Sequence, residues 1–104
     1  SESTLYDRSM WYFYVLQSLQ HSDWFYKGST NDLERRLVQH NQGEVVSTNF
    51  YKPLRLVYYE AYLTETAARK RESAIKNNGN MSVPLIRRIK EGFCESRHEA
   101  CGRL

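Results

Sequence analysis

Two short runs of aromatic and branched apolar residues, separated by a polar connection, constrain the fold of this chain more than any other feature of its sequence. The first run, WYFYVL, predicts a strand over about Trp11 to Ser18. The polar stretch after it reads as a hairpin loop, and Trp24 to Gly28 as the returning strand. Side-chain alternation places Tyr14 on one face of the first strand and Tyr26 on one face of its partner. The sequence therefore predicts an antiparallel hairpin that ends at a glycine.

A helix signal follows this glycine at once. Thr30 or Asn31 can cap a helix, and acidic residues in the next turn suit the positive end of its dipole. Gly43 is placed to end the helix. We expect Gly28 to let the chain turn tightly from the strand into this helix.

The helix carries its basic residues on different sides. Leu33 and Leu37, four residues apart, mark the buried stripe. At 100° per residue, Arg36 and His40 lie on one side of that stripe, while Arg35 points nearly opposite. Arg36 is therefore the arginine expected to lie against the body of the protein.

The rest of the chain predicts one more strand and two more helices. A loop is expected from Glu44 to Lys52 and a strand from Leu54 to Ala61. A helix is expected from Thr64 to Asn77, with Glu72 on the flank of its apolar face, and a short third helix from Val83 to Lys90.

Length and composition suit one globular domain. The chain has 104 residues, of which 40% are hydrophobic and 13% aromatic. We expect a flexible segment at 1–10, one folded domain at 11–91 and a tail at 92–104. Both cysteines fall in the tail, which does not resemble a disulfide framework and favours a reducing, cytoplasmic setting. No segment approaches the roughly 20 apolar residues of a membrane span.

Positive charge is concentrated in one part of the chain. The net charge is +3, but residues 52–90 hold nine of the fifteen Lys and Arg residues. Such a block favours a polyanionic partner, above all nucleic acid, although a solvated helix face explains any single cluster equally well. The candidate nucleic-acid contacts are Lys27, Arg35, Arg69, Lys70, Lys76, Arg87 and Arg88.

Five side chains with complementary chemistry can converge beside the hairpin: Tyr14, Tyr26, Arg36, His40 and Glu72. A metal held by a carboxylate polarises phosphoryl oxygens, a cation stabilises charge that grows in the transition state, and a phenol or imidazole moves the proton of the attacking water. Mg²⁺ fits because it often takes only one or two protein carboxylates. The grouping therefore suits phosphodiester hydrolysis.

Each of these residues also has a structural explanation when taken alone. A tyrosine can simply cover a strand, and Arg36 can extend along the leucine stripe to water. His40 suits the C-terminal end of a helix dipole, and Glu72 can pair with Lys76. Composition and spacing alone do not select these residues over their neighbours.

Four blocks of the sequence together resemble the GIY-YIG nuclease superfamily. They are YFYVL at 12–16, YKGSTNDLERRL at 26–37 followed by His40, PLRLVYYE at 53–60 and ARKRE at 68–72. More narrowly, the chain resembles the small single-domain bacterial members, relatives of the UvrC amino-terminal nuclease domain. The likeness covers about residues 11–90. It implies an α+β fold with a three-stranded antiparallel sheet flanked by about three helices, and hydrolysis of DNA phosphodiester bonds with one divalent metal, Mg²⁺ or Mn²⁺.

The resemblance also implies a role for each candidate. Tyr14 and Tyr26 take the places of the tyrosines of the first and second motifs. One of them, assisted by His40 or by metal-bound water, would deprotonate the nucleophile. Arg36 would stabilise the charge of the phosphorane, and Glu72 would hold the metal.

The sequence departs from the family pattern at several positions. Tyr12 and Phe13 replace the Gly and Ile of the first motif, and Lys27 replaces the Ile of the second. The late asparagine of the family corresponds to one of Asn77, Asn78 and Asn80, and the sequence does not choose among them.

The tail raises the question of a zinc site. Cys94, His98 and Cys101 have the spacing of metal ligands. A structural zinc site normally has four ligands and only three are present, so a flexible tail is the favoured interpretation.

The function expected is that of a divalent-metal-dependent endonuclease of DNA repair or recombination. The alternative is a non-catalytic nucleic-acid-binding module with the same fold, which would hold nucleic acid with basic and aromatic side chains. A purely structural interaction protein ranks third. Specificity would come from the helices and loops of the chain itself, or from a protein partner or homo-oligomer.

Overall fold

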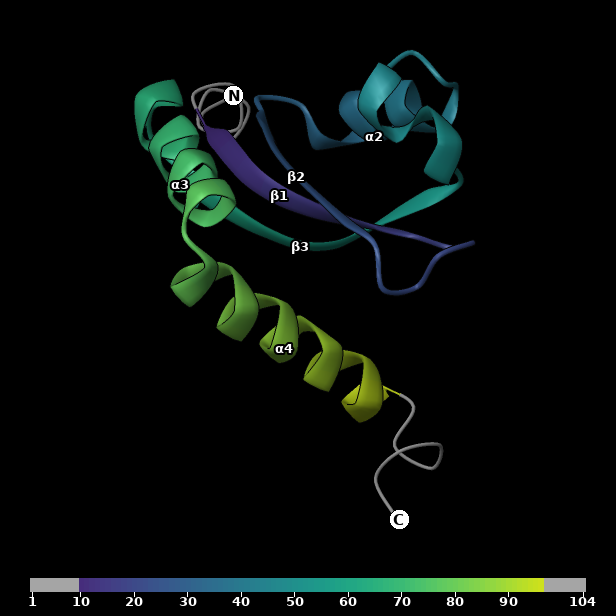
Figure 1. Cartoon of the computed structure of the whole chain (residues 1–104). Coiled ribbons are helices and arrows are strands. Elements are labelled where there is room, and N and C mark those ends of the chain that lie inside the picture. Colours follow the sequence, from purple (N-terminus) through teal and green to yellow (C-terminus); the bar gives the residue numbers. More distant parts are fainter. Residues whose placement is uncertain (1–9, 97–104) are drawn as a thin grey trace. The chain divides into compact units, whose positions relative to one another are not determined.

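The computed structural model describes residues 10–96 (Figure 1). The chain forms two compact units, with the boundary between Ser73 and Ala74. In chain order the elements are β1 (Trp11–Ser18), β2 (Phe25–Thr30), α2 (Leu33–Asn41), the 3-10 helix η1 (Val46–Tyr51), β3 (Leu54–Tyr62), α3 (Glu65–Asn77) and α4 (Gly79–Ser96). No helix among the described residues is long and apolar enough to cross a membrane.

The first unit contains a three-stranded antiparallel sheet with strand order β2-β1-β3, which confirms the predicted α+β fold. The central strand β1 is buried from Phe13 onward because strands flank it on both sides and helices cover it. Tyr14 lies between Gly28 and Tyr59 in the register, and Phe13 lies between Ser29 and Glu60. Since successive side chains of a strand point to opposite faces, these two rows lie on opposite faces of the sheet.

The face that carries Tyr14 is covered by α2. Tyr14, Leu16 and Leu54 form a buried cluster, against which Leu33 and Leu37 of α2 pack. The leucine pair is the stripe that the helical periodicity predicts. Both leucines are partly buried, so each contributes less than the about 1.5–3 kcal/mol of a fully buried leucine.

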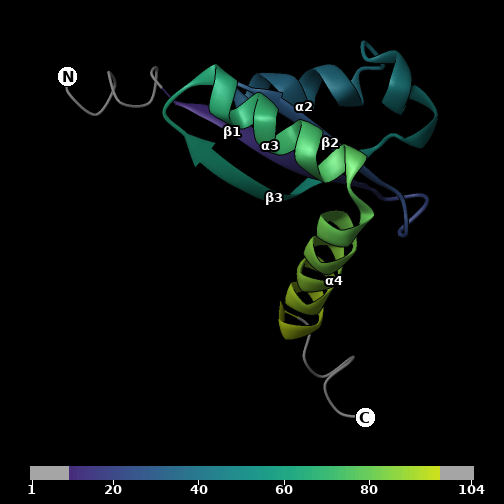
Figure 2. The same ribbon diagram turned by 60° about the vertical axis from the view of Figure 1, so that its left-hand side comes forward.

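The opposite face of the sheet meets α3, which lies alongside the strands in Figure 2. Ala68 of this helix is fully buried. The guanidinium of Arg71 lies 6.0 Å from the ring centre of Phe13. Phe13 itself is fully buried and makes an edge contact with the ring of Tyr58.

The cap of α2 differs from the sequence prediction. Asp32, rather than Thr30 or Asn31, is the N-cap, and its carboxylate accepts from the backbone N–H of Arg35 at 3.1 Å. The reason is that β2 continues through Thr30, so the helix starts later. Gly43 follows the helix with a φ of 80°, in the left-handed region that favours glycine, and this confirms its predicted role as terminator.

The expectation that Gly28 makes a turn is wrong. Gly28 lies within β2, directly opposite Tyr14, and its φ is not positive. The segment 44–52, which the sequence predicts to be a loop, contains the 3-10 helix η1.

In the second unit, α4 is longer than the predicted helix from Val83 to Lys90. The side chain of Asn78 accepts from the backbone N–H of Asn80 at 3.0 Å and so caps the helix four residues early. Leu85 and Ile89 are buried, whereas Val83 is 58% exposed.

Candidate active site

Tyr14 lies at the centre of the site. Its side chain is 2% exposed, yet its hydroxyl is held by two polar groups of α2. Arg36 Nε donates to Tyr14 Oη at 3.4 Å, and Tyr14 Oη lies 3.0 Å from His40 Nε2. The phenol is therefore fixed between a cation and an imidazole.

Gly28 is needed because of Tyr14. A Cβ atom at position 28 would lie 2.5 Å from Tyr14 Oη and 2.7 Å from Cζ, both far inside van der Waals contact. The phenol thus lies directly over edge strand β2, in space that any other residue would fill. Glycine at this position is explained by that close approach, not by a turn.

Four of the five predicted site residues come together on this face. The His40 ring centre lies 5.9 Å from that of Tyr14 and 5.0 Å from that of Tyr26, while the two tyrosine rings are 6.3 Å apart. Arg36 also donates to Gln39 Oε1 at 3.0 Å, which holds the arginine along α2. The prediction that Arg36, and not Arg35, lies against the body of the protein is confirmed, because Arg36 faces Tyr14 and Arg35 is exposed.

The fifth residue, Glu72, reaches the same edge strand from α3. Ser29 Oγ donates to Glu72 Oε1 at 2.5 Å, and Ser29 is the residue next to Gly28. The negative charge of Glu72 acts on Tyr14 and helps to raise its pKa. The carboxylate and the phenol therefore belong to one electrostatic neighbourhood at strand β2.

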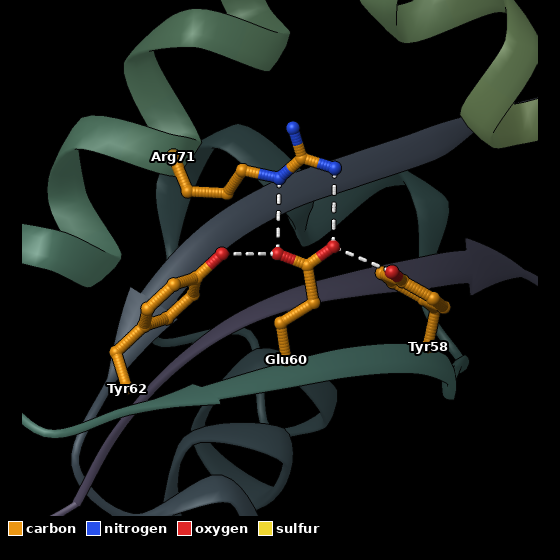
Figure 3. Close-up of polar contacts among 4 residues, drawn as sticks. All are labelled: Tyr58, Glu60, Tyr62 and Arg71. Atoms are coloured by element: carbon orange, nitrogen blue, oxygen red, sulfur yellow. Dashed lines mark hydrogen bonds and ion pairs between the residues drawn. The ribbon is translucent and has the colours of Figure 1, made fainter.

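Four side chains that the sequence reasoning left out of the site fix the position of α3 (Figure 3). Arg71 donates to both oxygens of Glu60, at 2.9 and 3.1 Å. The hydroxyls of Tyr58 and Tyr62 donate to the same carboxylate. Burial disfavours the charged form of Glu60, but these bonds outweigh it and lower its pKa.

Adjacent residues of α3 thus hold both edges of the sheet. Arg71 binds Glu60 on β3, and Glu72 binds Ser29 on β2. A bidentate arginine–carboxylate pair is geometrically specific. It sets the position of α3, and with it the position of Glu72.

Burial sets the protonation states of the two central groups. It raises the pKa of Tyr14 from 10.0 to about 12; the charges of Tyr26 and Glu72 add to this, and the hydrogen bond from Arg36 opposes it. Burial also lowers the pKa of His40 from 6.5 to about 4, with the charge of Arg36 as the second cause. At neutral pH Tyr14 is therefore protonated and His40 is uncharged.

The lowered pKa of His40 predicts a pH dependence of stability. The unfolded chain gains a proton on this residue as pH falls through 6.5, while the folded protein does not until about pH 4. The free energy of unfolding should therefore fall between these values, by about 3 kcal/mol from this group.

Urea titrations at several pH values would measure this loss. In the variant His40→Gln the slope of stability against pH between 6.5 and 4 should be smaller. Equal slopes in the wild type and the variant would contradict a buried, neutral His40.

The predicted basic contacts are divided between the two compact units. Lys27 lies on β2 opposite Val15, Arg35 and Lys70 are exposed, and Arg69 pairs with Glu65 at 2.6 Å. The other three are exposed side chains of the second compact unit: Lys76, Arg87 and Arg88.

Most of the candidate zinc ligands fall outside the described residues, so the question of a zinc site stays open. His98 and Cys101 lie outside the described residues, as does the side chain of Cys94. Within the part of the chain that the structure describes, no group of three or more His, Cys, Asp or Glu residues could hold a metal ion.

Thr48 is a buried polar residue of this site that the sequence did not reveal. It is fully buried, and its hydroxyl lies 2.8 Å from His40 Nδ1. Its segment reads as a loop, and a lone threonine in a loop carries no pattern that points to a partner eight residues earlier.

The sequence over residues 10–83 matches the family model described as the GIY-YIG catalytic domain. Together with the sheet topology and the clustered tyrosines, arginine and histidine, this match identifies the class of domain. The chain belongs to the GIY-YIG family, and a domain of this family implies nuclease-type activity.

Within the family, the chain is similar to small proteins designated UPF0213. It is 32% identical over 89 residues to the UPF0213 protein lin0209 of Listeria innocua, an alignment that covers 85% of this chain and 89% of that protein. It is 39% identical over 66 residues to a UPF0213 protein of Bacillus pumilus, covering 62% of this chain and 65% of the relative. A relative from Haloquadratum walsbyi is 39% identical over 67 residues, covering 64% and 73%.

Proposed function

We propose that this protein is an endonuclease that hydrolyses DNA phosphodiester bonds with a divalent metal, Mg²⁺ or Mn²⁺, in DNA repair or recombination. The observation that carries the proposal is the buried phenol of Tyr14, held between Arg36 and His40. The carboxylate of Glu72 lies at the same edge strand. These groups supply a proton acceptor, a cation and a metal ligand, which phosphodiester hydrolysis requires.

Tyr14 Oη is the atom proposed to take the proton of the attacking water. A phenol with a pKa of about 12 is not a base at neutral pH, so its own proton must leave as the water is deprotonated. His40 Nε2, 3.0 Å away and uncharged, is placed to receive it. This relay lets the neutral phenol of Tyr14 accept the proton of water without a phenolate forming beforehand.

Arg36 stabilises negative charge in two places. Its Nε donates to Tyr14 Oη and so favours the phenolate. The guanidinium carries further N–H groups, which can meet the phosphoryl oxygens where charge grows during the reaction. The ring of Tyr26 lies beside that of His40 and adds a second phenol to the site.

Glu72 is the residue proposed to hold the metal, which would polarise the phosphoryl group of the substrate. Ser29 binds one of its oxygens and so fixes the orientation of the carboxylate. One protein carboxylate fits Mg²⁺, whose other ligands can be water and substrate oxygens. It does not fit a structural zinc site, which takes four protein ligands.

Cleavage of a panel of labelled single-stranded, duplex, flap and branched DNAs with Mg²⁺, Mn²⁺ or EDTA tests the proposal. We expect cutting in the presence of metal, and a loss of at least about 10²-fold in Glu72→Gln. Glu34→Gln, on an exposed residue of α2, is the matched control and should cut normally.

Salt-dependent DNA binding without metal-dependent cutting on any substrate would overturn the endonuclease. That outcome would identify the non-catalytic nucleic-acid-binding module instead. A protein partner or a homo-oligomer that supplies specificity would show as a rate that depends on the added partner or on protein concentration.

A further inference from the structure

We infer that Thr48 is a positioning residue of the site: it holds His40 with its proton on Nδ1, so that Nε2 is left to take the proton of Tyr14. The inference rests on the proposed function, because it assigns a task within that reaction. It concerns a residue of η1 that contacts the imidazole from the side away from Tyr14.

The contacts place Thr48 and His40 in one buried pair. Both side chains are fully buried, so water does not compete for their hydrogen bonds. Thr48 Oγ1 lies 2.8 Å from His40 Nδ1 and donates to the carbonyl oxygen of Val45 at 3.4 Å. The two ring nitrogens of His40 therefore have different partners, Thr48 on one side and Tyr14 on the other.

The direction of the hydrogen bonds follows from proton counting. A threonine hydroxyl has one proton, which we assign to the 3.4 Å contact with the Val45 carbonyl, so that Oγ1 offers a lone pair to Nδ1. Nδ1 must then carry the ring proton, and Nε2 accepts from the hydroxyl of Tyr14. Tyr14 Oη in turn accepts from Arg36 Nε, so that every donor in this series of hydrogen bonds has an acceptor.

The opposite tautomer satisfies fewer groups. With the proton on Nε2, both His40 and Arg36 would donate to Tyr14 Oη, and the phenol proton would have no acceptor within this chain of bonds. The hydroxyl of Thr48 would turn to Nδ1, and the Val45 carbonyl would keep only the backbone N–H of Thr48. The main cost falls on the buried phenol, since a buried polar group without a partner costs about 1–3 kcal/mol.

The same arrangement serves the proton transfer. As Tyr14 Oη takes a proton from water, its own proton moves to His40 Nε2, and the hydroxide formed attacks phosphorus. The imidazolium then donates from both nitrogens, to Tyr14 Oη and to Thr48 Oγ1, without any rotation. When the bond to the leaving oxygen breaks, that oxygen takes a proton from solvent, His40 returns its proton to solvent through Tyr14, and the net change is hydrolysis.

Nitrogen NMR of protein labelled with ¹⁵N-histidine measures the tautomer without any substrate. The chain has three histidines, so a spectrum of His40→Gln assigns the signal of His40. In the wild type near neutral pH we expect a protonated Nδ1 and an unprotonated Nε2. Thr48→Ser, which keeps the hydroxyl, should give the same pattern, whereas Thr48→Val should move ring protons to Nε2.

A wild-type His40 protonated on Nε2, or a Thr48→Val protein with an unchanged tautomer, would overturn the inference. Circular dichroism of the wild type and the three variants verifies that they are folded. If Thr48→Val does not fold, the wild-type tautomer and that of Thr48→Ser still decide the question.

Cleavage kinetics separate this inference from the proposed function. Thr48→Val should lower kcat about 10–100-fold, the usual effect of removing an orienting partner, with DNA affinity unchanged. Thr48→Ser should restore most of the rate. Full activity in Thr48→Val would overturn the role of Thr48 alone, while a wild type with the expected tautomer that cuts no DNA would overturn the endonuclease.

Discussion

Tyr14→Phe is expected to lower the rate of DNA cleavage by about 10²–10⁴-fold, the range usual for loss of a positioned acid or base. The substitution removes the oxygen that lies 3.0 Å from His40 and 3.4 Å from Arg36. The ring that fills the core beside Leu16 remains, so the fold should be kept. The large effect is therefore expected in catalysis and not in folding.

Single-turnover cleavage of a labelled substrate at saturating Mg²⁺ measures this effect. Tyr59→Phe is a close control, because Tyr59 lies directly opposite Tyr14 on β3 but is 53% exposed. It should cut at the wild-type rate. A Tyr14→Phe protein as active as this control would exclude the phenol as the proton acceptor.

Gly28→Ala should have an effect of similar size on cleavage, although the residue has no side chain of its own. The added methyl group would lie 2.5 Å from Tyr14 Oη, so the phenol must leave its present position between Arg36 and His40. The loss of activity should approach that of Tyr14→Phe. Overpacking at a buried strand position should also cost about 1–3 kcal/mol of stability.

The control for this substitution is Gly92→Ala. At position 92 of α4 a Cβ atom meets nothing within 4 Å, and alanine in a helix interior is favoured over glycine. Thermal unfolding and cleavage rates of the two variants can be compared directly. If Gly28→Ala were as stable and as active as the wild type, the close packing of Tyr14 over β2 would be refuted.

The elements of the fold that follow from local patterns were well predicted from the sequence. The bounds of β1 agree with its aromatic run, and α3 begins one residue later than expected. The choice of Arg36 over Arg35 came from helical periodicity, which depends only on neighbouring residues. The capping residue of α2 was missed because the end of β2 decides where the helix starts.

The parts of the site that depend on distant pairings could not be predicted from the sequence. Glu72 accepts from Ser29, 43 residues earlier in the chain, and a helical wheel places Glu72 only on a flank. The need for a glycine at position 28 arises from the ring of a residue on another strand. The pairing of Arg71 with Glu60 depends in the same way on how α3 meets the sheet.

The central claim is that the phenol of Tyr14 and the carboxylate of Glu72, which reach strand β2 from opposite faces of the sheet, act in one reaction. Single-turnover cleavage by Tyr14→Phe, Glu72→Gln and the double variant tests it most directly. Groups that act as a unit are strongly non-additive, so the double variant should be about as slow as the slower single variant. Losses that multiply in the double variant, or a single variant that cuts at the wild-type rate, would contradict a shared site.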